Sequence, residues 1–229
     1  MTIALNSTSQ QDNVHVPYTK PTPANASSYQ PTHPRLLRVI LQQGQGADGQ
    51  DSYSSFLIAE QVGHSDRVSS RRLLKRCVFF TIKDLPANTV VTKLTNLTTG
   101  TKAYSSVQHG SGEHDHFELN SDLLFVNHSC SPNVAFDLST PRSAHDVEQE
   151  RYPAEWNLRT LSRPVAKGEV LTFFYPSTEW DMGAPFKCNC GESNCLGTIR
   201  GAKHLSLAQL KQQEFINPHI MQMKLEEAS

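Results

Sequence analysis

The sequence lacks a long apolar run, and this absence narrows the classes of protein that it can encode. No stretch approaches the about 20 consecutive apolar residues that a membrane-crossing helix needs, so we expect no membrane span. The start, Met1–Asn6, has neither a basic segment nor an apolar core, which argues against a secretory signal. We therefore expect residence in the nucleus or the cytoplasm.

A charge excess of either sign is also missing. Lysine and arginine total 21 against 22 aspartate and glutamate residues, for a formal net charge of -1. Direct binding to nucleic acid or to an anionic membrane surface is therefore not expected. One local basic run, Arg71–Arg76, is interpreted as a solvated edge of an element.

Cysteine is scarce, and its count is odd. The five cysteines stand at positions 77, 130, 188, 190 and 195. An odd number in a chain without a secretory signal indicates metal ligands or free thiols rather than a framework of disulfides.

The pattern along the chain predicts a mainly β fold. Residues 1–34 are polar, without apolar periodicity, and are predicted to be a disordered tail. Short apolar or β-branched runs separated by turn residues then predict strands. The predicted strands are Leu36–Leu41, Ser55–Ala59, Cys77–Ile82, Thr89–Leu94, Ala103–Val107, His116–Leu119, Leu123–Val126, Val134–Phe136, Asn157–Leu161 and Val170–Tyr175.

Two further segments are predicted between and after these strands. Ser139–Pro153 has two prolines and mixed charge, which is typical of a surface loop. Ser206 and Gln209 form a capping-box pattern that begins a short helix, which Pro218 interrupts before a frayed end.

The cysteines near the C-terminus have metal-ligand spacing. Cys188, Cys190 and Cys195 form a C-x-C-x4-C pattern, and Gly191 and Gly197 allow the tight backbone that such a knuckle needs. Structural zinc takes four ligands, so one more must come from elsewhere. Cys77, Cys130 and the ten histidines are the candidates.

Two motifs resemble those of a known family. Asn127-His128-Ser129-Cys130-x-Pro132-Asn133 closely resembles the signature of SET-domain methyltransferases, and Leu171-Thr172-Phe173-Phe174-Tyr175 is similar to the second signature of that family. The three-cysteine pattern follows where the family has its post-SET segment. The resemblance covers roughly residues 35–200, and in size the chain is similar to small stand-alone SET proteins of filamentous fungi.

The resemblance implies a fold and a domain organisation. The expected fold has small curved sheets with a pseudoknot, a post-SET zinc knuckle and a short C-terminal helix. Its parts would be the tail 1–34, a SET domain 35–180, the zinc motif 181–200 and a C-terminal helix or tail 201–229. The family also places the cysteine matching Cys130 on a structural zinc ion together with Cys188, Cys190 and Cys195.

The same resemblance implies an activity and its residues. Family members transfer a methyl group from S-adenosylmethionine to a lysine side chain of a protein, in some cases a histone. Tyr175 matches the catalytic tyrosine, and Phe173 matches the channel position where phenylalanine favours higher methylation. Asn127 and His128 match cofactor contacts, and Tyr104 is a weaker match to a further tyrosine.

Additional cofactor contacts are implied on both sides of the motifs. Leu196 and Ile199 would cover the adenine ring, while Lys75 and Cys77 occupy the positions of a Gly-x-Gly turn in the family. Side chains at these glycine positions would crowd the cofactor. Phe174 stands where an acidic residue is usual, which would remove a charge beside the catalytic tyrosine.

Three functions are consistent with these residues. The first is a protein lysine methyltransferase that uses S-adenosylmethionine. The second, motivated by the missing glycines, is a noncatalytic SET protein that serves as a binding or scaffold module. The third is a SET-fold protein recruited to a fungal pathway of small-molecule biosynthesis. Cofactor binding distinguishes the first from the second.

Overall fold

The computed structural model describes residues 18–21, 25, 28–40 and 78–227. The predicted strand Ser55–Ala59, the basic run Arg71–Arg76, and the predicted cofactor contacts Lys75 and Cys77 lie outside these residues. In the described part, no helix has the length and apolar character required to span a bilayer.

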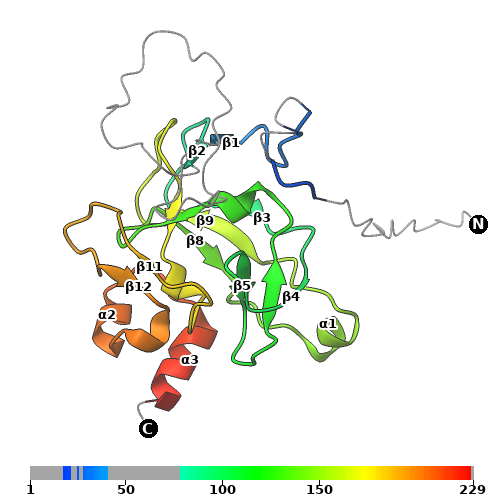
Figure 1. The fold of residues 1–229 in the computed structure, drawn as a ribbon. Coiled ribbons are helices and arrows are strands. Elements are labelled where there is room, and N and C mark those ends of the chain that lie inside the picture. Colours follow the sequence, from blue (N-terminus) through cyan, green and yellow to red (C-terminus); the bar gives the residue numbers. More distant parts are fainter. Residues whose placement is uncertain (1–17, 22–24, 26–27, 41–77, 228–229) are drawn as a thin grey trace, which may run out of the picture.

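The described chain is mainly β, as the sequence predicts, and its strands form small sheets (Figure 1). Two sheets have three antiparallel strands each, in the orders β3-β9-β8 and β4-β6-β5, and three sheets have two strands. The strands are β1 Leu37–Ile40, β2 Val78–Thr81, β3 Val90–Lys93, β4 Thr98–Gly100, β5 Ser106–Gln108, β6 His116–Glu118, β7 Asn127–His128, β8 Val134–Asp137, β9 Asn157–Thr160, β10 Thr172–Phe173, β11 Phe186–Lys187 and β12 Thr198–Ile199.

Helices are short and lie mostly near the C-terminal end. The helices are α1 Ala144–Glu148, α2 Leu207–Lys211 and α3 Pro218–Glu227, with 3₁₀ turns η1 Asp122–Phe125, η2 Tyr175–Ser177 and η3 Ala202–His204. Figure 1 shows β11, β12, α2 and α3 gathered on one side of the three-stranded sheets. The predicted capping box is confirmed, because the Ser206 side chain accepts from the Gln209 N–H while the Gln209 side chain accepts from the Ser206 N–H.

Two predicted strands and one predicted loop differ from the structure. Leu123–Val126 is not a strand, because the 3₁₀ turn η1 occupies Asp122–Phe125. Such short apolar runs cannot be assigned by periodicity alone. The strand predicted over Val170–Tyr175 shrinks to Thr172–Phe173, since Tyr175 already begins η2. The Ser139–Pro153 loop contains α1, which Ser143 caps.

The main core fills the space between the three-stranded sheets. Trp156, Phe117 and Phe136 are fully buried there, and the Trp156 indole N–H donates to the Thr140 carbonyl at 2.7 Å. A buried indole needs such an acceptor, because an unpaired polar group inside the core would destabilise the fold. Phe173 at the end of β10 belongs to this core.

A second, smaller cluster lies under the C-terminal helices. Phe174, Leu210 and Ile220 are buried together in it. Successive residues of an extended strand point to opposite sides, so Phe173 enters the main core while Phe174 enters this cluster. Phe174 therefore packs α2 and α3 against the rest of the fold and does not line the pocket described below.

The described part of the N-terminal region contacts η1. The Thr32 N–H donates to Asp122 Oδ2 at 2.8 Å, and the Asp122 N–H donates to Thr32 Oγ1 at 2.9 Å. Burial raises the pKa of Asp122, although these hydrogen bonds favour its charged form. The predicted domain boundaries, including the tail 1–34, stay a prediction.

Candidate active site and metal centre

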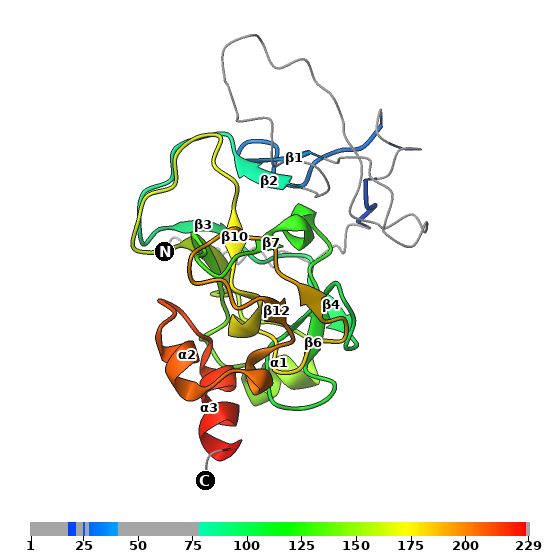
Figure 2. The ribbon, with the colours of Figure 1, turned by 60° about the vertical axis from the view of Figure 1, so that its left-hand side comes forward.

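The motif residues are brought together by a pair of very short parallel strands. β7 and β10 pair with Asn127 opposite Thr172 and His128 opposite Phe173, as Figure 2 shows near its centre. The Ser129 N–H donates to the Phe173 carbonyl at 3.1 Å and extends the pairing by one step. The threading of a pseudoknot stays a prediction.

Asn133 stabilises the β7–β10 strand pair through hydrogen bonds to the backbone at β10. Its Oδ1 accepts from the Thr172 N–H at 2.9 Å, and its Nδ2 donates to the Val170 carbonyl at 2.8 Å. Its backbone N–H donates to the Thr172 carbonyl at 3.1 Å. The buried asparagine thus supplies the hydrogen bonds that a neighbouring strand would otherwise give to these backbone groups.

His128 connects this strand pair to the cysteines. Its Nδ1 accepts a hydrogen bond from the Tyr175 N–H at 3.1 Å, so that nitrogen carries no proton. The proton therefore sits on Nε2, which faces the sulfur of Cys130 at 3.4 Å. The imidazole is buried and bridges the start of η2 to one of the predicted metal ligands.

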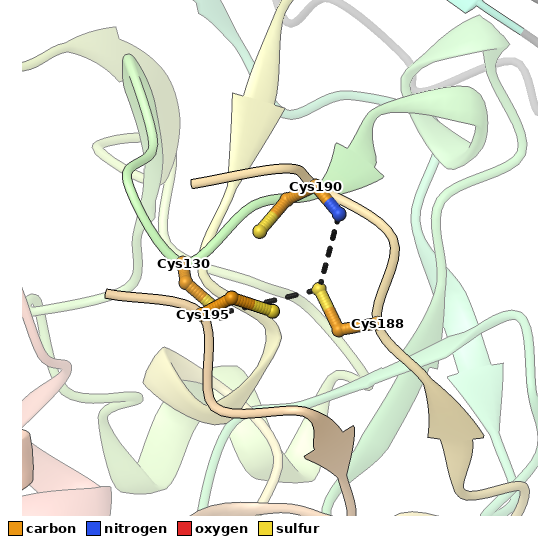
Figure 3. Close-up of side chains that lie close together, drawn as sticks. All are labelled: Cys130, Cys188, Cys190 and Cys195. Atoms are coloured by element: carbon orange, nitrogen blue, oxygen red, sulfur yellow. Dashed lines mark hydrogen bonds between the residues drawn. The ribbon is translucent and has the colours of Figure 1, made fainter. Parts of the chain in front are cut away.

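The four predicted zinc ligands converge. The sulfur atoms of Cys130, Cys188, Cys190 and Cys195 all lie within 4.8 Å of one another, and Figure 3 shows the mid-chain Cys130 meeting the three from the C-terminal segment. The Cys130 and Cys188 sulfurs are 4.0 Å apart. Tetrahedral thiolates about 2.3 Å from one zinc ion would be separated by about 3.8 Å. The cluster therefore fits a four-sulfur zinc site.

Its electrostatics also favour a cation. Burial raises the pKa of the Cys130 thiol, and burial beside neighbouring sulfurs raises the pKa of Cys188 to about 11. Burial opposes ionisation of Cys190 too, but hydrogen bonds to its sulfur outweigh it and lower its pKa to about 7. Four adjacent thiolates need a positive ion between them, and zinc supplies that charge.

The backbone around the knuckle takes the conformation that its glycines allow. Gly191 has a φ of 77° and Gly197 a φ of 78°, a region that residues with a side chain rarely enter. The Leu196 N–H donates to the Cys130 sulfur at 3.4 Å, and the Cys190 N–H donates to the Cys188 sulfur at 3.4 Å. Such N–H donors stabilise thiolate ligands.

A cavity of about 450 Å³ lies beside the strand pair. Its wall includes Asn127, His128, Phe173 and Tyr175, so four of the predicted site residues share one pocket. Tyr104, the weaker match, lies on the same wall and is 69% exposed. The volume is within the range of small-molecule sites.

Tyr175 is held firmly within this wall. Its ring packs against Phe173 at a centroid distance of 4.6 Å and against Phe186 at 5.8 Å, and its hydroxyl donates to the Val126 carbonyl at 3.2 Å. Phe173 in turn meets Phe136 edge to face at 4.7 Å. The tyrosine is thereby fixed at three points in an aromatic environment.

Leu196 and Ile199, the predicted adenine contacts, lie beside the cysteines. Ile199 is buried against Cys130 and Cys188, and Leu196 is partly buried next to the same group. Their role toward a cofactor stays a prediction.

Glu179 is a pocket residue that sequence reasoning missed. It follows Tyr175 by one turn, its N–H donates to the Tyr175 carbonyl at 3.0 Å, and it lines the cavity. No motif marks this position, and an acidic residue before a tryptophan looks like an ordinary surface residue. Only the fold reveals that it is buried.

These features define a SET-type site: a parallel strand pair that carries an Asn-His pair, a tyrosine that follows it in η2, and a cysteine cluster next to the histidine. No protein-family model matches the chain. Methyltransferase flvH of Aspergillus flavus is 37% identical over 192 residues, which are 83% of this chain and 82% of flvH.

The similarity to histone-lysine methyltransferases covers a smaller share of those proteins than of flvH. The H3 lysine-36-specific histone-lysine N-methyltransferase of Mycosarcoma maydis is 33% identical over 87 residues, 37% of this chain and 8% of that protein. Histone-lysine N-methyltransferase SETD2 of Mus musculus is 24% identical over 201 residues, 72% of this chain and 7% of SETD2. The solved structure of KRYPTONITE in complex with mCHG DNA and SAH aligns with a TM-score of 0.40 and 17% identity, covering 56% of this chain and 27% of that chain.

The similarity to flvH runs through most of both chains. The chain belongs to the family of SET-domain methyltransferases. It spans less than a tenth of the two histone-directed relatives, whereas it spans most of flvH.

Proposed function

We propose that this protein is an S-adenosylmethionine-dependent N-methyltransferase that acts on the side-chain amine of a protein lysine. The single observation that carries the proposal is the position of Tyr175, which lies on the pocket wall with its backbone N–H bound to His128 and its ring fixed by Phe173 and Phe186. Relatives named as histone-lysine N-methyltransferases support the lysine substrate, and histone H3 is the first partner to test.

The residues present suit the cosubstrate and the chemistry. Bound S-adenosylmethionine supplies a methyl group on a sulfonium, which a neutral amine can attack directly. Asn127 lies at the pocket wall, half-buried, where its side chain amide can hold the polar amino-acid end of the cosubstrate.

The pocket wall has two tasks toward the amine. A lysine amine has a pKa of about 10.4 in water, so the site must admit it and then favour its neutral form. The positive sulfonium of the bound cosubstrate disfavours a second positive charge beside it, and the Tyr175 hydroxyl can orient the nitrogen. Fixed alignment of this kind contributes about 7–11 kcal/mol to lowering a barrier. Phenylalanine at position 173 leaves room for successive methylations.

A free alkylamine is the second candidate substrate. The coverage of the relatives motivates it, because the chain matches flvH, whose name specifies no histone substrate, over 82% of that protein but the histone-directed enzyme of Mycosarcoma maydis over only 8%. Residence in the nucleus or the cytoplasm and the absence of direct nucleic-acid binding are part of the same proposal.

The first experiment measures cosubstrate binding and methyl transfer. Calorimetry of the full zinc-loaded chain with S-adenosylmethionine should give saturable heat, followed by transfer of a radiolabelled methyl group to H3 peptides. The Tyr175→Phe variant should lose at least 100-fold in kcat while its zinc content stays the same. Tyr152→Phe, a tyrosine outside the pocket wall, is the matched control and should keep full activity.

Two results would contradict the proposal. Absence of heat at high cosubstrate concentration would leave only a binding or scaffold role for this fold. Full activity of Tyr175→Phe would mean that another group orients the amine.

A further inference from the structure

Glu179 places a carboxyl group at the pocket wall, and only one of its two oxygens has hydrogen-bond partners among the described residues. Its side chain is 9% exposed. Oε1 accepts from the Gln108 N–H at 2.9 Å and lies 3.4 Å from Thr178 Oγ1. Among the described residues, no hydrogen bond or ion pair reaches Oε2. Glu179 lines the cavity, so a molecule inside the cavity can contact this residue.

The charged groups around Glu179 do not neutralise it. Burial raises its pKa to about 7, while Lys102 lowers the value only slightly. Lys102 is itself paired with Asp181 at 3.6 Å. His219 lies behind Thr178, with Nε2 3.0 Å from the Thr178 carbonyl, and burial lowers the pKa of both His219 and His116. Near neutral pH these imidazoles are uncharged, so no residue in the described part of the chain gives the carboxyl group a fixed cation.

The rest of the wall suits a cation as well. Tyr104, Phe173, Tyr175 and Phe186 all line the cavity, and the faces of aromatic rings attract ammonium groups. One ammonium already lies at this wall: Lys20 Nζ is 5.2 Å from the centre of the Tyr104 ring and 3.1 Å from its hydroxyl.

We propose that Glu179 is a specificity-determining residue of this pocket, and that its Oε2 receives the ammonium group of an alkylamine substrate. The inference rests on the proposed function, because it names the group that selects the amine. An alkylamine is mostly protonated at neutral pH, so the pocket must first bind the cation. Glu179 supplies the opposite charge in a desolvated place where an unpaired carboxylate would otherwise be unfavourable.

The inference predicts a preference that can be measured without knowing the natural substrate. The probes are n-pentylamine and the neutral 1-hexanol, titrated by calorimetry into the full zinc-loaded chain saturated with S-adenosylhomocysteine. At pH 8 the protein should bind n-pentylamine at least tenfold more tightly than 1-hexanol. At pH 6 the preference should fall about tenfold, because the carboxylate fraction of a group with a pKa of about 7 falls from about 0.9 to about 0.1.

Two variants separate the charge from other effects. Glu179→Gln keeps the size of the side chain and should lose the preference together with its pH dependence. Glu113→Gln removes an acidic charge from an exposed position outside the pocket wall and should keep both. Glu179→Asp, which keeps the charge, should retain part of the preference and serves if Glu179→Gln does not fold. Retention of the preference in folded Glu179→Gln would overturn the inference.

Kinetics with a lysine peptide and with n-pentylamine then distinguish the two sources of the amine. For the one that accepts methyl groups, Glu179→Gln should raise KM at least tenfold with a smaller change in kcat. A loss confined to kcat would overturn the inference. If neither amine is methylated while the binding preference persists, the proposed function fails and the role of Glu179 stands.

Discussion

At the residue scale, the buried position of Glu179 in the pocket lowers the stability of the fold when its carboxyl group is ionised. A carboxyl group without a fixed cation is desolvated in the folded state, so the folded protein favours its protonated form. Its contribution to stability is therefore present below the unfolded pKa, about 4.5, and is lost as the pH rises through about 7.

This loss can be measured against a variant that does not titrate. Between pH 5 and pH 8, the free energy of unfolding of the wild type should fall relative to that of Glu179→Gln by at most about 3 kcal/mol, which is the size of the pKa shift in energy. Urea unfolding at the two pH values measures the difference. Parallel curves for the two proteins would show that position 179 is not desolvated in solution.

At the scale of elements, Asn217 joins helix α3 to the rest of the fold. The side chain is fully buried; Nδ2 donates to the carbonyls of Phe136 at 2.9 Å and Ser177 at 3.0 Å, and Oδ1 accepts from the Leu138 N–H at 2.8 Å. Asn217, which directly precedes Pro218, thus forms hydrogen bonds with backbone groups at the end of β8 and in η2, the turn that begins with Tyr175.

Removing this amide should loosen the helix. Asn217→Ala leaves buried backbone groups without partners, and we expect it to lower the free energy of unfolding by about 3 kcal/mol, or the Tm by about 6–12 °C for a chain of this size. Thermal unfolding measures the change. Gln222→Ala on the exposed side of α3 is the control and should change the Tm by less than about 2 °C. An equal effect of the two variants would contradict this role for Asn217.

The same helix shows where sequence reasoning reached its limit. Pro218 was expected to interrupt a helix, but it occupies the first turn of α3, where its missing N–H costs nothing. Whether a short segment becomes a helix or a strand depends on its packing against distant residues. For this reason the sequence wrongly predicts a strand where the structure has η1. The cysteines and the Asn127–His128 pair were predictable because the chemistry restricts both the residue type and its spacing.

At the scale of the whole molecule, the cysteine cluster ties the C-terminal segment to the middle of the chain. Cys130 and Cys188 are 58 positions apart, and Cys130 also accepts through its carbonyl from the Asn194 side chain at 3.0 Å. A metal ion that binds the folded protein more tightly than the unfolded protein stabilises the fold. Here it would do so by joining two segments that lie far apart in the sequence.

Metal content should therefore report the fold. We expect one zinc ion per chain, measured by elemental analysis, and a lower Tm after treatment with a chelator. Cys130→Ser should lose most of the zinc affinity. Cys77→Ser is the control, because Cys130, Cys188, Cys190 and Cys195 already supply the four ligands that structural zinc takes, and it should keep one ion. Equal zinc content in both variants would show that Cys130 is not a ligand.

The His128 ring joins the cysteine cluster to the backbone of Tyr175. Peroxide that oxidised Cys130 and a neighbouring cysteine to a disulfide, being itself reduced to water, would release a bound metal ion and shift the sulfur that faces Nε2, so that the ring is free to turn. Its Nδ1 would in turn release the backbone of Tyr175. Peroxide should accordingly silence turnover while most of the secondary structure, monitored by circular dichroism, is still intact.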